Sequence, residues 1–119
     1  MSNLPLSPLA PDSFPHLSDI AGIRLSVGRS GMKYKDRDDV MVLLAQEGST
    51  VAGIFTQSAT AAAPVDWSRA GIASGNPRAI ITNAGNANAF TGMRGTTAMR
   101  HSLSKLADTL SLADTQILV

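Results

Sequence analysis

The stretch from residue 78 to residue 110 constrains the fold most, because it passes from an apolar run through a polar loop to an amphipathic helix. Residues 78–83 are mostly apolar and follow the breaker Gly75-Asn76-Pro77, which predicts a buried strand. Residues 96–110 carry apolar side chains at helical spacing, with Thr96 or Thr91 as the cap. The apolar face consists of Met99, Leu103, Leu106, Ala107 and Leu110. A strand, a loop and a helix in this order predict an α/β fold.

The remaining pattern is consistent with this fold class. Residues 23–27 alternate apolar and polar, which indicates a half-buried strand, and the continuous apolar run at 40–44 indicates a strand buried on both faces. Residues 51–56 are interpreted as a strand returning in a hairpin with 40–44. A short helix is predicted over 67–72 with Asp66 as its cap, and an apolar strand begins at 116–119.

Composition limits both the size and the chemistry of the domain. A chain of 119 residues is enough for one small domain but argues against two independent cores. The net charge of +1 gives no basic stripe, so a nucleic-acid partner is not expected. The absence of cysteine excludes disulfides and thiolate sites, and the presence of only two histidines, far apart in the sequence, argues against a histidine-rich zinc site. No membrane-spanning run and no signal-peptide pattern occur, which predicts a cytoplasmic protein.

Prolines divide the chain into an arm and a domain. Residues 1–15 hold four prolines, each of which fixes its own φ and restricts the preceding residue. Residues 1–21 are therefore predicted to be a non-helical arm, either docked on a partner or solvated. Residues 22–119 form the α/β part.

The loop after the strand at 78–83 is rich in asparagine and glycine and is the candidate site. Its candidate residues are Asn83, Gly85, Asn86 and Asn88. Ligands of α/β proteins collect at the carboxyl ends of strands and at helix N-termini. The loop is the wall of a substrate site, a brace for a catalytic loop, or an asparagine ladder that satisfies a tight turn. No nucleotide-binding glycine pattern is present.

No complete catalytic set can be assembled from the residues themselves. His101 falls on the polar side of its helix and is expected at the surface, and His16 lies in the arm without an obvious partner. Asp38 and Asp39 are sequence neighbours whose side chains point to opposite sides of an extended segment. Trp67 is expected to be a packing anchor. A non-catalytic module that binds a small anion or a partner therefore stays open as an alternative.

Residues 78–92 resemble the signature of the ornithine acetyltransferase family, the glutamate N-acetyltransferases of arginine biosynthesis. The segments 51–56 and 62–67 are also similar to members of this family, as are the opening 22–24 and the run 33–38. The resemblance extends from about residue 5 to residue 119. Ala84 stands where serine is frequent in the family, and Phe90 where cysteine is frequent.

The resemblance implies an α/β sandwich of mixed sheet and helices, similar to N-terminal-nucleophile hydrolases, of which this chain is only a part. It implies a precursor that cuts its own backbone before a threonine, whose hydroxyl then becomes the nucleophile. Acetyl passes from N-acetylornithine to glutamate, and some members also use acetyl-CoA. A Thr-Gly pair in a Ser-Thr-Gly segment forms the oxyanion hole, and the two chains assemble as an α2β2 heterotetramer. No cofactor and no metal are implied.

The same resemblance implies that this chain carries no catalytic residue. The Ser-Thr-Gly segment would follow directly after Val119, and the nucleophilic threonine would lie further on. Thr91-Gly92 belongs to the asparagine loop and is not the oxyanion pair. We therefore expect the front of the α segment, inactive alone and poorly soluble, with the remainder of that segment and the β chain as partners. An amide hydrolase of the same fold is the other alternative.

Overall fold

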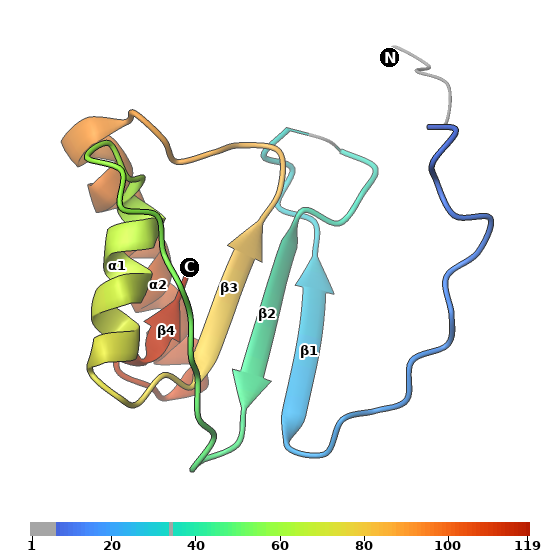
Figure 1. Cartoon of the computed structure of the whole chain (residues 1–119), viewed down its shortest axis with the longest axis horizontal. Coiled ribbons are helices and arrows are strands. Elements are labelled where there is room, and N and C mark those ends of the chain that lie inside the picture. The colour runs from blue at the N-terminus through green and yellow to red at the C-terminus, as the bar shows by residue number, and fades with distance from the viewer. Residues whose placement is uncertain (1–6, 34) are drawn as a thin grey trace.

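The computed structural model describes residues 7–33 and 35–119, so the first six residues of the predicted arm and Tyr34 lie outside the described part. One four-stranded sheet in the order β1-β2-β3-β4 forms its centre (Figure 1). The strands are β1 (Ile23–Gly28), β2 (Val40–Ala45), β3 (Ala79–Asn83) and β4 (Ile117–Leu118). The helices are α1 (Ala63–Ala73) and α2 (Gly92–Leu110), with a 3₁₀ turn, η1, at Asp114–Gln116. The predicted mixed α/β architecture is confirmed.

The sheet combines both strand orientations. β2 pairs antiparallel with β1 and with β3, whereas β3 pairs parallel with β4. A parallel pair needs a crossover connection, and α2 supplies it between β3 and β4. The carboxyl ends of β1 and β3 consequently lie at the same end of the sheet as the start of α2 (Figure 1).

The predicted hairpin between residues 40–44 and 51–56 is wrong, because residues 51–58 form neither strand nor helix. Both edges of β2 are already paired, with β1 and with β3, so no edge is left for a returning strand. Gly53 and Phe55 of this segment lie beside α1, whereas Ile54 is fully exposed. A Cβ on Gly53 would lie 3.0 Å from Ile72 Cδ1, and the guanidinium of Arg69 lies 5.6 Å from the centre of the Phe55 ring.

Both helices begin four residues before their predicted starts. Pro64 sits in the first turn of α1, where its missing N–H costs no helical hydrogen bond. Asp66 does not cap α1 but lies in the first turn and pairs with Arg69 at 2.8 Å. In α2 the N-cap is Thr91, although its hydroxyl does not bond to the helix backbone.

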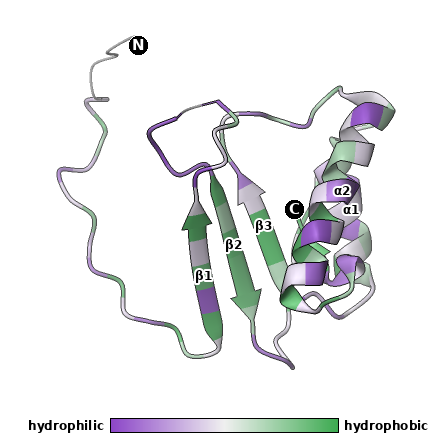
Figure 2. Ribbon diagram, turned by 180° about the vertical axis from the view of Figure 1, so that it is seen from behind, coloured by the Kyte–Doolittle hydropathy of each residue, from purple (hydrophilic) through white to green (hydrophobic). Residues whose placement is uncertain are grey.

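The core lies between one face of the sheet and α2. Met99, Leu103 and Ala107 of α2 pack against Ala79 and Ile117, which confirms the predicted apolar face. α1 flanks β4. Figure 2 shows that the central strands are mainly hydrophobic, whereas both hydrophilic and hydrophobic residues occur along the helices. Trp67 packs against the core, as predicted, and its Nε1–H donates to the carbonyl of Ile117 at 2.8 Å.

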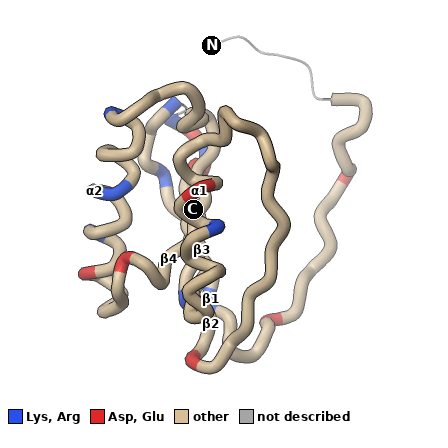
Figure 3. The backbone as a smooth tube through the Cα atoms, turned by 60° about the vertical axis from the view of Figure 1, so that its left-hand side comes forward, with Lys and Arg blue, Asp and Glu red and all other residues tan. Residues whose placement is uncertain are grey.

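Residues 7–20 contain no helix or strand and are almost entirely exposed. In Figure 1 they run beside β1 without joining the sheet. Figure 3 shows basic and acidic residues interleaved along the described chain rather than gathered by sign. Among the described residues, no helix is both long and apolar enough to cross a membrane.

Candidate functional site

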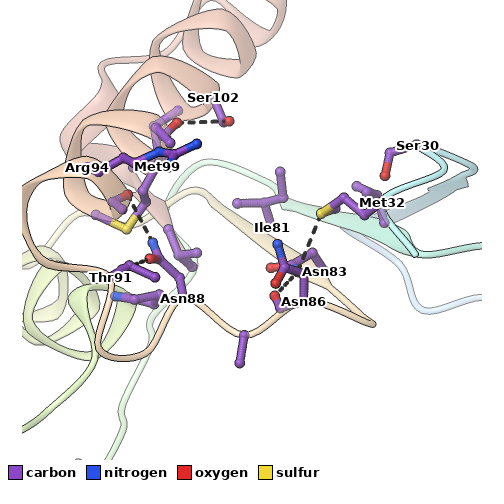
Figure 4. Close-up of a pocket in the computed structure, with 17 residues that line it drawn as sticks. Ser30, Met32, Ile81, Asn83, Asn86, Asn88, Thr91, Arg94, Met99 and Ser102 are labelled. Carbon is purple, nitrogen blue, oxygen red and sulfur yellow. Dashed lines mark hydrogen bonds between the residues drawn. The ribbon is translucent and has the colours of Figure 1, made fainter.

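A pocket of about 620 Å³ opens at the end of the sheet, between the strand ends and the first half of α2 (Figure 4). One wall comes from the segment after β1 and from the end of β3. The opposite wall comes from the loop before α2 and from α2 itself. The pocket floor is apolar, with Ile81, Met99 and Leu103 among its lining residues. The fold therefore forms a cavity at the location where ligands of α/β proteins collect.

The asparagine loop forms the rim of this pocket. Asn83, Asn86 and Asn88 line it as a group, whereas Gly85 does not line it. Asn83 Nδ2 donates to the carbonyl of Asn86 at 2.8 Å and lies 3.8 Å from Met32 Sδ (Figure 4). Gly85, with a φ of 94°, supplies the left-handed residue of the tight turn.

Asn88 ties the second half of the loop to α2. Its Nδ2 donates to the carbonyl of Gly95 at 3.0 Å, and its Oδ1 accepts a hydrogen bond from the Thr91 hydroxyl. In the structure the amides of Asn83 and Asn88 satisfy backbone carbonyls of the loop and of α2, and both residues also line the pocket. Whether they contact a substrate stays a prediction.

The wall from the β1–β2 connection was not anticipated from the sequence. Ser30 and Met32 line the pocket, and both backbone N–H groups donate to the buried carboxylate of Asp39, at 2.6 and 3.0 Å. The N–H of Ser30 is the main cause that holds the pKa of Asp39 below its ordinary value of 3.8, and the N–H of Met32 adds to it. Burial acts in the opposite direction but is outweighed.

The charge of the pocket has one sign. Arg94, in the first turn of α2, is the charged side chain among the lining residues, which include no carboxylate. Ser30 and Ser102 add hydroxyl groups to the lining. The combination of one cation, several amides and an apolar floor fits a small molecule with a negatively charged group and an aliphatic chain.

None of the side chains rejected as catalytic lines this pocket, although the carboxylate of Asp39 bonds to two residues that do. His101 is exposed, as expected. Asp38 is exposed and pairs with Arg29 at 3.0 Å, whereas Asp39 is buried, so the two carboxylates do point apart. Among the described residues, no cluster of three or more histidines and carboxylates could hold a metal ion.

Sequence reasoning missed Ser30, Met32, Asp39 and Arg94. A signal for Asp39 existed, since it directly precedes a buried strand and follows a Ser-Gly turn by eight residues. Only the β1–β2 register brings that turn back to the carboxylate. Arg94 lies in the first turn of α2, but the helix was predicted to begin at residue 96. The sequence therefore did not predict that Arg94 lines the pocket.

Val119 also lines the pocket and is held from outside the sheet. The hydroxyl of Ser68 donates to the carbonyl of Val119 and accepts from its N–H, both at 2.9 Å. Through these two hydrogen bonds, α1 holds the residue that follows β4 at the lining of the pocket.

Comparison with known proteins gives consistent matches. The model of the ArgJ family matches residues 24–119. The "Arginine biosynthesis bifunctional protein ArgJ" of Agrobacterium fabrum is 40% identical over 112 residues, which cover 94% of this chain and 27% of that protein. The protein of the same name from Nitrobacter winogradskyi is 48% identical over 99 residues, 80% of this chain and 24% of that protein.

Two solved structures match the fold. The ornithine acetyltransferase of Mycobacterium tuberculosis, complexed with ornithine, has a TM-score of 0.78 at 30% identity, covering 83% of this chain and 54% of that one. The ArgJ protein of Bacillus halodurans has a TM-score of 0.76 at 27% identity, covering 83% of this chain and 52% of that one. The chain spans about a quarter of the length of the curated relatives. It matches the ArgJ model over most of its length, and it belongs to the ArgJ family.

Proposed function

We propose that this chain is the front part of a longer enzyme that transfers an acetyl group from N-acetylornithine to glutamate in arginine biosynthesis. The match to the ArgJ model over residues 24–119 carries this proposal. The relatives are named as bifunctional proteins of arginine biosynthesis, and a solved neighbour is described with ornithine bound. Because the chain spans about a quarter of its relatives, the activity belongs to the longer protein.

The pocket supports this choice of substrate. N-acetylornithine and glutamate both carry an α-carboxylate and a side chain with methylene groups. A pocket lined by Arg94 and by no carboxylate suits that group, and the apolar floor suits the methylenes. We place Asn83, Asn86 and Asn88 at the border of the active site, where their amides can bind polar groups of the substrate.

The chemistry itself is assigned to residues outside this chain. The hydroxyl of a threonine exposed by self-cleavage attacks the acetyl carbonyl, and its proton passes through the threonine α-amine to the nitrogen of ornithine as the amide bond breaks. The glutamate amine then attacks the resulting ester, the bond to the threonine oxygen breaks, and a proton of that amine returns to the threonine hydroxyl. The oxyanion Thr-Gly pair is proposed to follow Val119. The position of Val119 in the pocket lining supports this arrangement. Residues 1–119 alone are therefore expected to be inactive.

The proposal extends to the state of the whole enzyme. The partners of this chain are the remainder of the α segment and the β chain, assembled as α2β2 in the cytoplasm. The enzyme needs no cofactor or metal, and acetyl-CoA is a second acetyl donor if the enzyme is bifunctional.

The test uses the full-length protein with acetyl-labelled N-acetylornithine and glutamate. Labelled N-acetylglutamate is the expected product, and residues 1–119 alone should form none. Intact-mass analysis should give two chains, the second beginning with threonine. If acetyl-CoA replaces N-acetylornithine as the donor, formation of N-acetylglutamate would indicate a bifunctional enzyme, and no product would indicate a monofunctional one.

Other outcomes identify the alternatives. Release of labelled acetate without N-acetylglutamate would indicate an amide hydrolase. Binding of a carboxylate ligand with no turnover and no cleavage of the chain would indicate an anion-binding module, which the positive charge of the pocket also favours.

A further inference from the structure

Asp39 is a buried charged residue, with only 3% of its surface exposed. Its Oδ1 accepts the backbone N–H of Ser30 at 2.6 Å, and its Oδ2 accepts that of Met32 at 3.0 Å. Gly31 lies between these two residues with a φ of 71°, and this left-handed step turns both N–H groups toward the same carboxylate. The side chain therefore holds the turn that follows β1.

The main chain of Asp39 makes two further hydrogen bonds, one to the end of β1 and one to the start of the asparagine loop. Its N–H donates to the carbonyl of Gly28 at 3.0 Å, where β1 ends. Its carbonyl accepts the N–H of Ala84 at 2.8 Å, where the asparagine loop begins. One residue thus holds both segments that form the same wall of the pocket.

These two segments also meet at the pocket itself. Met32 Sδ lies 3.8 Å from Asn83 Nδ2, and both residues line the cavity together with Ser30 (Figure 4). Any shift of the turn at residues 30–32 moves this wall relative to α2. We propose that Asp39 is a positioning residue that sets the width of the pocket by holding this turn against the asparagine loop.

Asp38 provides a matched control in the next position of the chain. It carries the same charge but is exposed, and its partner is the exposed Arg29 side chain rather than the backbone of the turn. Removing the charge of Asp38 leaves the N–H groups of Ser30 and Met32 bonded, whereas Asp39→Asn replaces one acceptor oxygen by an NH₂ donor.

The first measurement is amide hydrogen exchange on the full-length protein. Within residues 7–33 and 35–119, the N–H groups of Ser30 and Met32 donate to the Asp39 carboxylate and to no other acceptor. Loss of a hydrogen bond to a charged group corresponds to about a tenfold increase in exchange. Asp39→Asn should produce that increase at residues 30–32, and Asp38→Asn should leave their exchange within about twofold of the wild type. Equal exchange in both variants would overturn the proposal.

The second measurement rests on the proposed function and compares KM with kcat for acetyl transfer. Asp39→Asn should raise KM for the amino-acid substrates about tenfold while kcat falls less, because the pocket wall moves but the nucleophile does not. Asp38→Asn should change neither. A loss of kcat at unchanged KM would contradict the positioning role. Faster exchange in a protein that never transfers acetyl would instead reject the proposed function and retain the role of Asp39.

A second variant covers the case in which Asp39→Asn fails to fold. Gly31→Ala retains the carboxylate but disfavours the left-handed backbone, and its new Cβ meets no atom within 4 Å. The same exposed turn should loosen, with the same increase in exchange at residues 30–32 and the same rise in KM. Unchanged exchange and unchanged KM in Gly31→Ala would refute the proposal.

Discussion

Gly95 is a single residue on which the position of the asparagine loop at the pocket rim depends. A Cβ at this position would collide with the Thr91 hydroxyl and with the Asn88 amide oxygen. The missing side chain therefore lets the asparagine loop fold onto the first turns of α2. Glycine costs a helix about 1 kcal/mol relative to alanine, so its presence in α2 is explained by this close approach.

Gly95→Ala should therefore destabilise the protein, although alanine is the better helix former. We expect the free energy of unfolding to fall by about 1–3 kcal/mol, because the added methyl group overlaps the side chains of Thr91 and Asn88. Thr97→Ala, on the exposed surface of the same helix, should be neutral or slightly stabilising. Urea unfolding of the full-length protein measures both variants, and a stabilised Gly95→Ala would disprove the close packing.

Arg94 is predicted to bind the substrate carboxylate. Arg94→Gln should raise KM for glutamate about tenfold, because a charge-assisted hydrogen bond is lost. Lys105→Gln removes the same charge from the same helix but away from the pocket, and it should leave KM unchanged. Steady-state kinetics compare the two variants, and equal effects would show a general electrostatic origin instead.

Asp39 should make stability depend on pH on the acid side. Its pKa in the folded protein is held below 3.8, first by the N–H of Ser30, so its contribution is complete above the unfolded value and is lost as the pH falls through the folded value. The difference in melting temperature between wild type and Asp39→Asn should be constant above about pH 5 and should shrink below pH 3.8. A difference that persists at acid pH would assign the effect to packing.

The sequence alone can identify a candidate site residue when the role of that residue depends on neighbours close to it in the chain. Asn83, Asn86 and Asn88 stand out because their loop is local and its composition is unusual. Ser30 and Asp39 do not stand out, because their contact depends on the pairing register of β1 and β2.

Among the elements, β4 is the shortest strand, and Val119, which directly follows it, lines the pocket. β4 has only two residues and pairs with β3 on one edge, while α1 supplies side chains to its other edge. The Trp67 indole takes the carbonyl of Ile117, and the Ser68 hydroxyl bridges the N–H and the carbonyl of Val119. These contacts block further strand pairing at that edge.

Ser68→Ala should leave both backbone groups of Val119 without a partner in a half-buried position. We expect a loss of about 1–3 kcal/mol in the free energy of unfolding. Ser104→Ala, on the exposed face of α2, should change it by less than about 0.5 kcal/mol. Thermal unfolding of the full-length protein compares them, and equal losses would show that the hydroxyl bridge contributes nothing.

Helix and strand could be told apart from the sequence where the hydrophobic pattern was long, as in α2, or where glycine and proline bounded it, as before β3. Residues 51–56 were misassigned because an apolar segment after a turn was interpreted as the returning strand of a hairpin. That pattern does not identify the packing surface, which here is α1 rather than a strand.

On the scale of the whole molecule, one face of the sheet is uncovered. α2 packs on the face of Ala79 and Ile81, and residues directly opposite in the register share a face. Leu25 and Val27 therefore lie on the other face, where 62% and 67% of their surfaces are exposed. A small domain rarely leaves such a surface open, which agrees with a chain that spans a quarter of its relatives.

Residues 1–119 expressed alone should therefore aggregate. Static light scattering should show association that increases with concentration, and Leu25→Thr with Val27→Thr should reduce it because both side chains lie on the open face. Arg24→Thr, on the opposite face of β1, should not reduce it. A monodisperse, cooperatively folding fragment would contradict the view that further chain covers this face.

We propose that the pocket between the asparagine loop and α2 is the substrate site of a longer acetyltransferase. Hydrogen exchange of the full-length protein, measured with and without saturating ornithine, would show whether ornithine binds there. We predict slower exchange at residues 30–32 and 83–88 when ornithine is bound. Protection confined to segments outside residues 1–119, with these two unchanged, would contradict it.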